Sequence, residues 1–175
     1  MSRSRSRSRP NTIQGQFRYH TIDLVGSPVW RALSLSERRI LDRIDLELAS
    51  HGGRDNGDLI ITRRDFAAFG VSPKAQLRGI AGLVALGPIK WMPGHASPDP
   101  AHGRAARFGI LYRATRDGTA DEQWRRFKTP AEVKTTLARA RAGVEARNRT
   151  QRGKKTDAIM VPFGNHYLVG PKGNY

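Results

Sequence analysis

The fold is decided by one stretch of the chain, residues 59–92, which reads LIITRRDFAAFGVSPKAQLRGIAGLVALGPIKWM. It predicts two short helices joined by a tight turn. The first helix begins after Thr62, a good N-cap residue, and ends at Gly70, because glycine suits the left-handed position that closes a helix. The second begins after the N-cap Ser72, with a proline in the first helical position, and ends at Gly87.

The second helix is predicted to have an apolar underside and a small, basic outer face. Its apolar residues recur at helical spacing and are expected to be buried: Leu77, Ile80, Ala81 and Val84. The outer face carries Lys74, Ala75, Gln76, Arg78 and Gly79, with Gly82 one turn later. No carboxylate occurs in the helix. The sequence therefore predicts a helix whose outer face can enter the major groove of a duplex.

The candidate DNA-binding residues of this helix are Ser72, Lys74, Gln76, Arg78 and Gly79. Gln76 and Arg78 have donors suited to base edges, Lys74 can neutralise a phosphate, and the small residues allow close approach. A simpler interpretation stays open. In that interpretation Gly79 and Gly82 only let another helix pack closely, while the two cations form an ordinary solvated face.

A β-ribbon is predicted after the second helix. Residues 89–92 and 107–113 are rich in β-forming side chains and should pair around the polar loop 93–106. Such a loop can lie along the phosphate backbone or in a minor groove, which makes Arg104 and Arg107 candidate DNA contacts. Any long surface loop has a similar composition, so this signal is weak when taken alone.

A longer helix is predicted upstream, from the capping box at Ser34 to about Ser50. Its buried stripe consists of Ile40, Leu41, Ile44 and Leu48. Its acids, among them Asp42, Asp45 and Glu47, are expected to pair with arginines of the same helix. Residues 59–61 should form a strand that pairs with the ribbon. The predicted fold class is thus mainly α with a small β-sheet, an α+β domain.

The composition fits one folded domain with basic tails. With 38% hydrophobic residues in 175, the chain can fill one core but hardly two. We divide it into an arm (1–16), a domain (17–128), a basic amphipathic helix (129–150) and a flexible tail (151–175). The net charge is +16, to which residues 1–20, 21–130 and 131–175 contribute +5, +5 and +6. More than half of the surplus lies outside the domain, as expected if the tails attract phosphates.

The arm and the C-terminal region are expected to contact nucleic-acid phosphates without regard to base sequence. Residues 2–9 are a Ser-Arg repeat without an apolar side chain, which predicts disorder. The helix after residue 129 has a narrow apolar stripe, which favours docking on the domain or pairing with a second copy over a free basic arm. The arm residues expected to touch phosphates are Arg3, Arg5, Arg7, Arg9, Arg147, Arg149, Lys154 and Lys155.

The tail contains a short near-repeat. Residues 162–167 read PFGNHY and residues 171–175 read PKGNY. A repeated Pro-x-Gly-Asn-Tyr pattern outside a globular core is typical of a docking peptide, so a protein partner is one hypothesis. Accidental similarity within a Gly/Pro-rich tail is the simpler interpretation.

Six short motifs follow one another between Phe17 and Thr129. They are SPVWRAL (27–33), RRILDR (38–43), GG (52–53), NG (56–57), DF (65–66) and LG (86–87). Their order resembles the small winged helix-turn-helix proteins of bacterial plasmids, phages and integrated mobile elements, which are similar to replication-initiator domains and MarR-type regulators. The resemblance implies binding of double-stranded DNA, often as a homodimer. Pro88 departs from the pattern, because an apolar or aromatic residue commonly follows the glycine at 87.

Catalysis finds little support in the sequence. There is no cysteine, and no Gly-x-x-x-x-Gly-Lys loop that could cradle a phosphate. His95, Asp99 and His102 carry donor atoms for a metal, but they lie on a proline-rich loop. We therefore expect no enzyme, no cofactor and no metal site. No apolar run approaches the ~20 residues of a membrane span, so the expected location is the cytoplasm, on the nucleoid, without a membrane partner.

The expected function is binding of double-stranded DNA as a transcriptional regulator or as a replication or recombination accessory factor of a bacterial mobile element. The alternative is a basic RNA-associated or ribosome-associated protein that uses the domain as a scaffold. The basic segments offer few aromatic platforms for stacking single-stranded bases, which favours the first reading.

Overall fold

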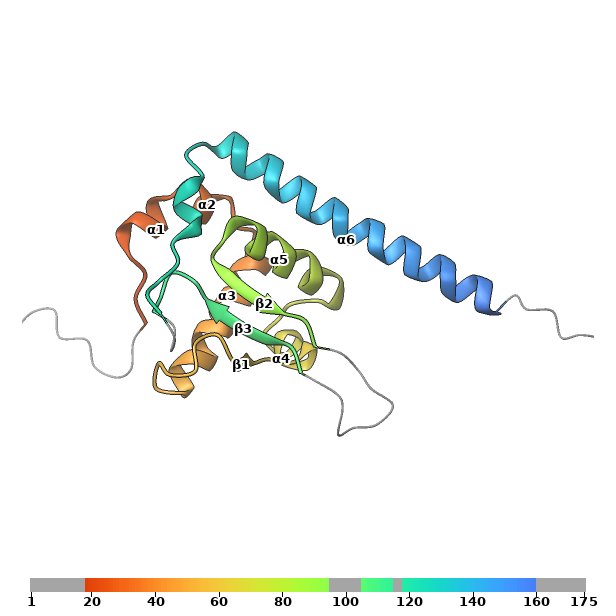
Figure 1. Cartoon of the computed structure of the whole chain (residues 1–175), viewed down its shortest axis with the longest axis horizontal. Coiled ribbons are helices and arrows are strands. Elements are labelled where there is room, and N and C mark those ends of the chain that lie inside the picture. Colours follow the sequence, from red (N-terminus) through yellow and green to blue (C-terminus); the bar gives the residue numbers. More distant parts are fainter. Residues whose placement is uncertain (1–17, 95–104, 115–117, 160–175) are drawn as a thin grey trace, which may run out of the picture.

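The computed structural model describes residues 18–94, 105–114 and 118–159, with side chains up to residue 150. The described chain is mainly helical with one small antiparallel sheet, which confirms the predicted α+β class. Its elements follow in this order (Figure 1): α1 (Ile22–Gly26), α2 (Pro28–Ala32), α3 (Leu35–Ser50), β1 (Leu59–Ile60), α4 (Arg63–Ala68), α5 (Pro73–Leu86), β2 (Ile89–Met92), β3 (Arg107–Ile110), the 3-10 helix η2 (Gln123–Arg126) and α6 (Pro130–Ile159).

The three strands form a sheet in the order β1-β3-β2, with both pairings antiparallel. Phe108 on the central strand lies opposite Leu59 on one side and Trp91 on the other. Its ring also meets the Phe66 ring of α4 edge to face, with centroids 5.5 Å apart. The predicted ribbon and its added strand are therefore present, although β3 ends at Ile110 rather than at residue 113.

The core is organised around α3. This helix begins after Ser34, whose hydroxyl and the Glu37 side chain form the predicted capping box. Its apolar stripe is buried as predicted: Ile40, Leu41, Ile44 and Leu48. From this stripe α3 contacts α4, α5, β1 and β3, so one helix holds the sheet and the helix pair together.

A buried asparagine fixes the end of the central strand. Asn56 is only 5% exposed, and its side-chain oxygen accepts a hydrogen bond from the Ile110 N–H at 2.7 Å. Its amide nitrogen donates to the carbonyls of Ile110 and Ala114, both at 2.9 Å. The turn that the sequence predicts around Asn56 is therefore tied to the end of the central strand rather than being a free surface turn.

The acids of α3 pair differently from the sequence expectation. Glu47 does pair with Arg43 of its own helix, at 2.8 Å. Asp42 instead binds Arg18, which precedes α1. Asp45 is fully buried among residues from distant parts of the chain: Arg18, His20, Tyr112 and Arg113. This buried cluster joins the segment before α1 and the segment after β3 to the middle of α3.

The imidazole in this cluster predicts a pH dependence of stability. Burial lowers the pKa of His20 below the ordinary 6.5, with Arg18 and Arg113 acting in the same direction and Asp45 and Asp42 against it. The folded chain thus binds a proton at His20 less readily than the unfolded chain does. The stability that His20 contributes is complete above pH 6.5 and is lost as the pH falls toward the lowered pKa. Urea titrations between pH 8 and 5 should show this decline, and His20→Gln should flatten it.

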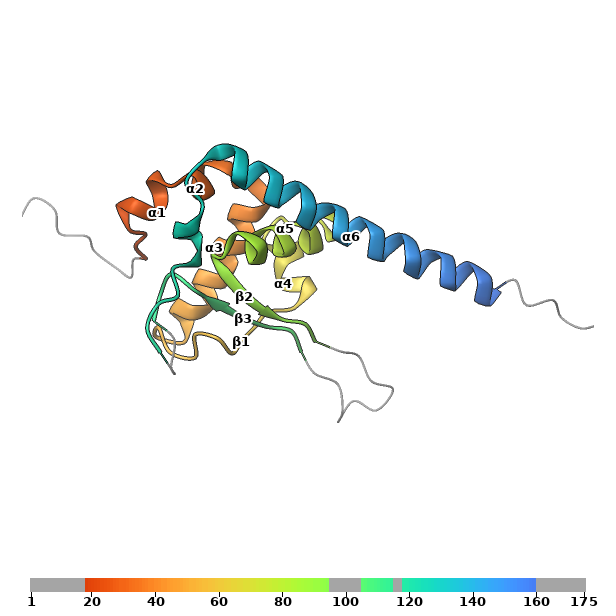
Figure 2. The ribbon, with the colours of Figure 1, turned by 45° about the horizontal axis from the view of Figure 1, so that its top comes forward.

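The last helix, α6, is 30 residues long and packs on α5 along its first half. Val133, Leu137 and Val144 are buried, whereas every residue from 145 to 150 is exposed. Both views show the second half projecting away from the other elements (Figures 1 and 2). The helix therefore docks on the domain, and it continues to Ile159 rather than ending at residue 150. Within the described ranges, no helix is long and apolar enough to cross a bilayer.

Candidate nucleic-acid interface

Helix α5 is turned by roughly a third of a revolution from the predicted orientation. Its buried residues are Gln76, Gly79, Ile80, Gly82, Leu83 and Leu86. Its exposed and half-exposed residues include Lys74, Leu77, Arg78, Ala81 and Val84. Of the predicted buried stripe only Ile80 is in the core, so that prediction was wrong. The helix carries apolar side chains on two faces, and the face with the glycines is the one that packs.

The two glycines let neighbouring helices approach α5 closely. A Cβ atom on Gly79 would lie 2.6 Å from the Ile40 side chain of α3. One on Gly82 would lie 2.6 Å from a carboxylate oxygen of Glu37 and 3.0 Å from Leu137 of α6. Gly79 is therefore a packing residue and not a DNA contact, as the simpler interpretation of the sequence had it.

Gln76 is also a structural residue. It is 4% exposed, and its side-chain nitrogen donates to the carbonyls of Arg63 and Val71, both at 3.0 Å. Both amide hydrogens are thus used inside the protein, and neither is free to read a base. The prediction that Gln76 reads base edges was wrong. The side chain instead ties the start of α4 and the turn to the first turn of α5.

Removing this tie should be costly for stability. In Gln76→Leu the buried Val71 carbonyl loses its side-chain donor and the start of α4 is released, which we expect to lower the free energy of unfolding by about 1–3 kcal/mol. Urea denaturation measures the change. The neighbouring exposed position provides the control, because Lys74→Leu should shift stability by no more than about 0.5 kcal/mol. Equal effects at the two positions would contradict the role given to Gln76.

The cations that remain available lie at the start of α4 and α5. Arg63, Arg64 and Lys74 are exposed, and none has a carboxylate partner among the described residues. The bond from Gln76 to the Arg63 carbonyl keeps the first turns of the two helices together. The turn between the helices is held from behind, because Arg39 of α3 donates to the Gly70 carbonyl at 2.8 Å. Sequence reasoning missed Arg63 and Arg64, although their place directly after an N-cap marks them as exposed.

The other predicted contacts have mixed positions. Ser72 is exposed, and its hydroxyl makes no capping hydrogen bond. Arg78 is half exposed and pairs with Glu145 of α6 at 3.2 Å. Arg107 is exposed and pairs with Asp58 at 2.9 Å. Arg104 lies outside the described residues.

Helix α6 carries further cations, which are spread around the helix. Lys134, Arg139, Arg147 and Arg149 are exposed. Because Leu137 meets Gly82 and Glu145 meets Arg78, α6 runs antiparallel to α5. Its projecting half therefore extends past the first turn of α5 (Figure 2). Lys154 and Lys155 belong to this half, but their side chains are outside the description, as are Arg3, Arg5, Arg7 and Arg9 of the arm and the repeat in residues 162–175.

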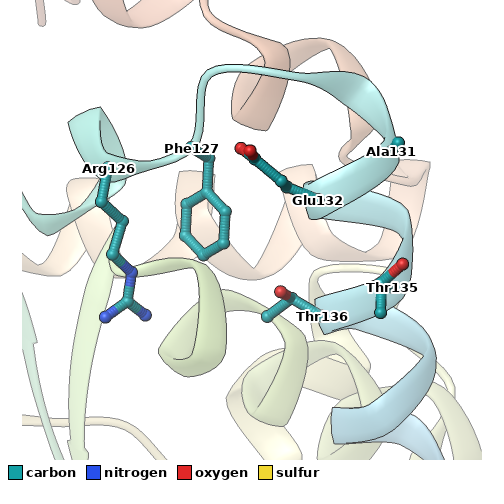
Figure 3. Close-up of a pocket in the computed structure, with 6 residues that line it drawn as sticks. All are labelled: Arg126, Phe127, Ala131, Glu132, Thr135 and Thr136. Atoms are coloured by element: carbon teal, nitrogen blue, oxygen red, sulfur yellow. The ribbon is translucent and has the colours of Figure 1, made fainter.

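An open groove of about 590 Å³ lies between η2 and the start of α6 (Figure 3). Phe127 forms its apolar wall, and Arg126 lies over that ring while donating to the Ala85 carbonyl at 2.8 Å. Glu132 accepts from the backbone N–H groups of Lys128 and Thr129, and these bonds lower its pKa. Glu132 thus serves the start of α6, and Arg126 serves the last turn of α5. Among the described residues no cluster of three metal-ligating side chains occurs either.

The chain was compared with protein-family models, with curated proteins and with solved structures, and none of the three comparisons found a match. A functional assignment therefore depends on the geometry and charge of the described residues.

Proposed function

We propose that this chain binds double-stranded DNA through a winged helix-turn-helix domain. The observation that carries the proposal is the convergence of Arg63, Arg64 and Lys74 at the start of α4 and α5, exposed and without carboxylate partners in the described chain. The order of elements supports it, because a helix, a strand, a helix pair and a β-ribbon follow one another with β3 in the centre of the sheet. Exposed cations at the start of two adjacent helices suit a phosphate backbone.

The solvent face of α5 supports affinity more than sequence discrimination. It carries Lys74 and Arg78 beside Leu77, Ala81 and Val84, and it contains no acid. Apolar side chains in a major groove contact thymine methyl groups, and Arg78, a donor suited to guanine, is paired with Glu145. With Gln76 buried, we expect most of the binding energy to come from phosphates and the preference between sequences to be modest.

Helix α6 extends the proposed surface. Arg147 and Arg149 lie on its exposed half, about 200° apart around the helix, so one of the two can face a duplex that contacts Lys74. The basic arm and tail would add attraction that does not depend on sequence. The same proposal has four further parts, which rest on the resemblance of the motifs. They are a role in transcription, replication or recombination of a bacterial mobile element, a homodimer, association with the nucleoid and a protein partner bound by the tail.

Competition binding tests the proposal. The full chain is bound to a fluorescent 30-base-pair duplex, and unlabelled duplex or RNA of equal length is added at fixed salt. We expect the duplex to compete at lower concentration than structured or single-stranded RNA does. Stronger competition by RNA would overturn the proposal and favour an RNA-associated protein. Repeating the assay with several duplex sequences measures the modest discrimination expected of α5.

A further inference from the structure

A polar cleft of about 300 Å³ lies where the starts of α3 and α5 meet the middle of α6. Two groups of side chains line it. The hydroxyls come from Ser34, Ser36 and Ser72, and the cations are Lys74, Arg78 and Arg141. Residues from three separate helices, α3, α5 and α6, thus line one concave site.

The positive charge of the cleft is cancelled from within only at Arg141, which pairs with Glu37. Its acid, Glu37, is 1% exposed and has both oxygens in use. One accepts from the backbone and the hydroxyl of Ser34, at 2.8 and 2.7 Å, and the other accepts from Arg141 at 2.9 Å. Glu37 is therefore committed to the start of α3 and to the docking of α6. It has no free oxygen for Lys74 or Arg78.

Several donors in the cleft are unused. Among the described residues, neither the Ser36 nor the Ser72 hydroxyl has a hydrogen-bond partner, and the Lys74 ammonium and backbone N–H have none. Arg78 has one partner, the exposed carboxylate of Glu145, at 3.2 Å. A group with several acceptor oxygens and a negative charge matches this set of donors, and cations of this kind bind phosphate through charge-assisted hydrogen bonds.

We propose that this cleft binds a phosphate group. The inference rests on the proposed function where the phosphate belongs to the backbone of a bound duplex, because Lys74 is shared by the cleft and the DNA surface. A small phosphorylated molecule presents the same chemistry. Glu145 would compete with a phosphate for Arg78, because its carboxylate already pairs with that guanidinium at 3.2 Å.

The pair between Arg78 and Glu145 allows a test in which two variants change phosphate affinity in opposite directions. Arg78→Gln removes a donor and should weaken phosphate binding about tenfold. Glu145→Gln removes the competing carboxylate and should strengthen binding about threefold, by a gain of the size measured for an exposed ion pair. Both variants break the same ion pair between α5 and α6. An effect on helix docking alone would therefore move both in the same direction.

The experiment uses the full chain with inorganic phosphate and, separately, with a duplex of random sequence. Amide NMR shifts at Ser36, Ser72 and Lys74 report on the cleft, and chloride at equal ionic strength is the control anion. Arg54→Gln is the matched variant. It removes one exposed arginine beyond the other end of α3, roughly 25 Å away at 1.5 Å per residue, and it should leave the phosphate titration unchanged.

The titrations with phosphate and with duplex distinguish this proposal from the proposed function. Saturable shifts with phosphate and with duplex, changed in opposite directions by the two variants, support a cleft that takes a backbone phosphate. Shifts with phosphate but not with duplex support a site for a small phosphorylated ligand and count against DNA at this surface. Duplex binding that both variants leave unchanged, with no saturable phosphate shifts, overturns the cleft and leaves DNA binding intact.

Discussion

Replacing Asp45 by alanine should lower the free energy of unfolding by about 3–5 kcal/mol, a large share of the stability of a small domain. The carboxylate is fully buried and is the shared partner of several side chains. The Tyr112 hydroxyl donates to it at 3.1 Å, and the guanidinium of Arg113 lies 3.4 Å away. In the alanine variant that hydroxyl loses its acceptor and that arginine, largely buried, loses its counter-charge.

The electrostatics of this cluster explain why removing the Asp45 carboxylate should destabilise the protein by more than its ion pairs stabilise it. Burial raises the pKa of Asp45 even though Arg113, His20 and Arg18 lower it, so desolvation outweighs the attraction of its partners. Burial and the nearby carboxylate also raise the pKa of the Tyr112 hydroxyl, which keeps it a donor over the working pH range. A buried ion pair adds little net stability when complete, but a single charge left behind is expensive.

Two further variants make the Asp45 prediction specific. Asp45→Asn keeps an acceptor for Tyr112 and loses only the charge, so its cost should lie between wild type and alanine. Asp42→Ala removes the neighbouring acid, which is partly exposed and pairs with Arg18, and should cost no more than about 1 kcal/mol. Urea denaturation at pH 7 measures all three. Equal losses for Asp45→Ala and Asp42→Ala would show that burial does not decide the effect.

This cluster also marks a limit of what the sequence predicts. The capping box at Ser34, the apolar stripe of α3 and the pair between Arg43 and Glu47 are local patterns, and all are present. The partners of Asp45 lie 25 to 68 residues away along the chain, at positions 20 and 113 among others. No spacing rule connects them. The mixed charges of α3 predicted a solvated face, whereas the structure buries two of the acids of this helix, Glu37 and Asp45.

The orientation of α5 shows a second limit. Leu77, Ala81 and Val84 form one apolar stripe, while Ile80, Leu83 and Leu86 form another, so periodicity alone offered two undersides. Packing selects the second, because glycines beside it let α3 and α6 come close. Glycine has no side chain to count in a hydrophobic pattern, and its role becomes visible only when the neighbouring helices are in place. The sequence correctly predicted that α5 is a helix with a buried apolar stripe, but it predicted the wrong stripe.

Removing the exposed cations of the proposed DNA surface should weaken duplex binding strongly. The variant Arg63→Gln, Arg64→Gln, Lys74→Gln deletes three charges at the start of α4 and α5. At about 1 kcal/mol for each exposed contact to phosphate, affinity should fall roughly 100-fold near 0.15 M salt. The slope of log K against log salt should become shallower by about 2.7, because each lost phosphate contact removes ~0.9. Fluorescence anisotropy across a salt series measures both quantities.

A triple variant with the same loss of charge separates local contact from general attraction. Arg31→Gln, Arg54→Gln and Lys128→Gln remove three exposed cations that also lack carboxylate partners among the described residues, but from other parts of the surface. Because charges beyond about one Debye length of ~8 Å are largely screened at this salt, the control should change affinity far less. If both triple variants weaken binding equally and shift the slope equally, the helix pair is not the docking surface. Binding would then depend on total charge, as expected for a chain held to nucleic acid mainly by its basic tails.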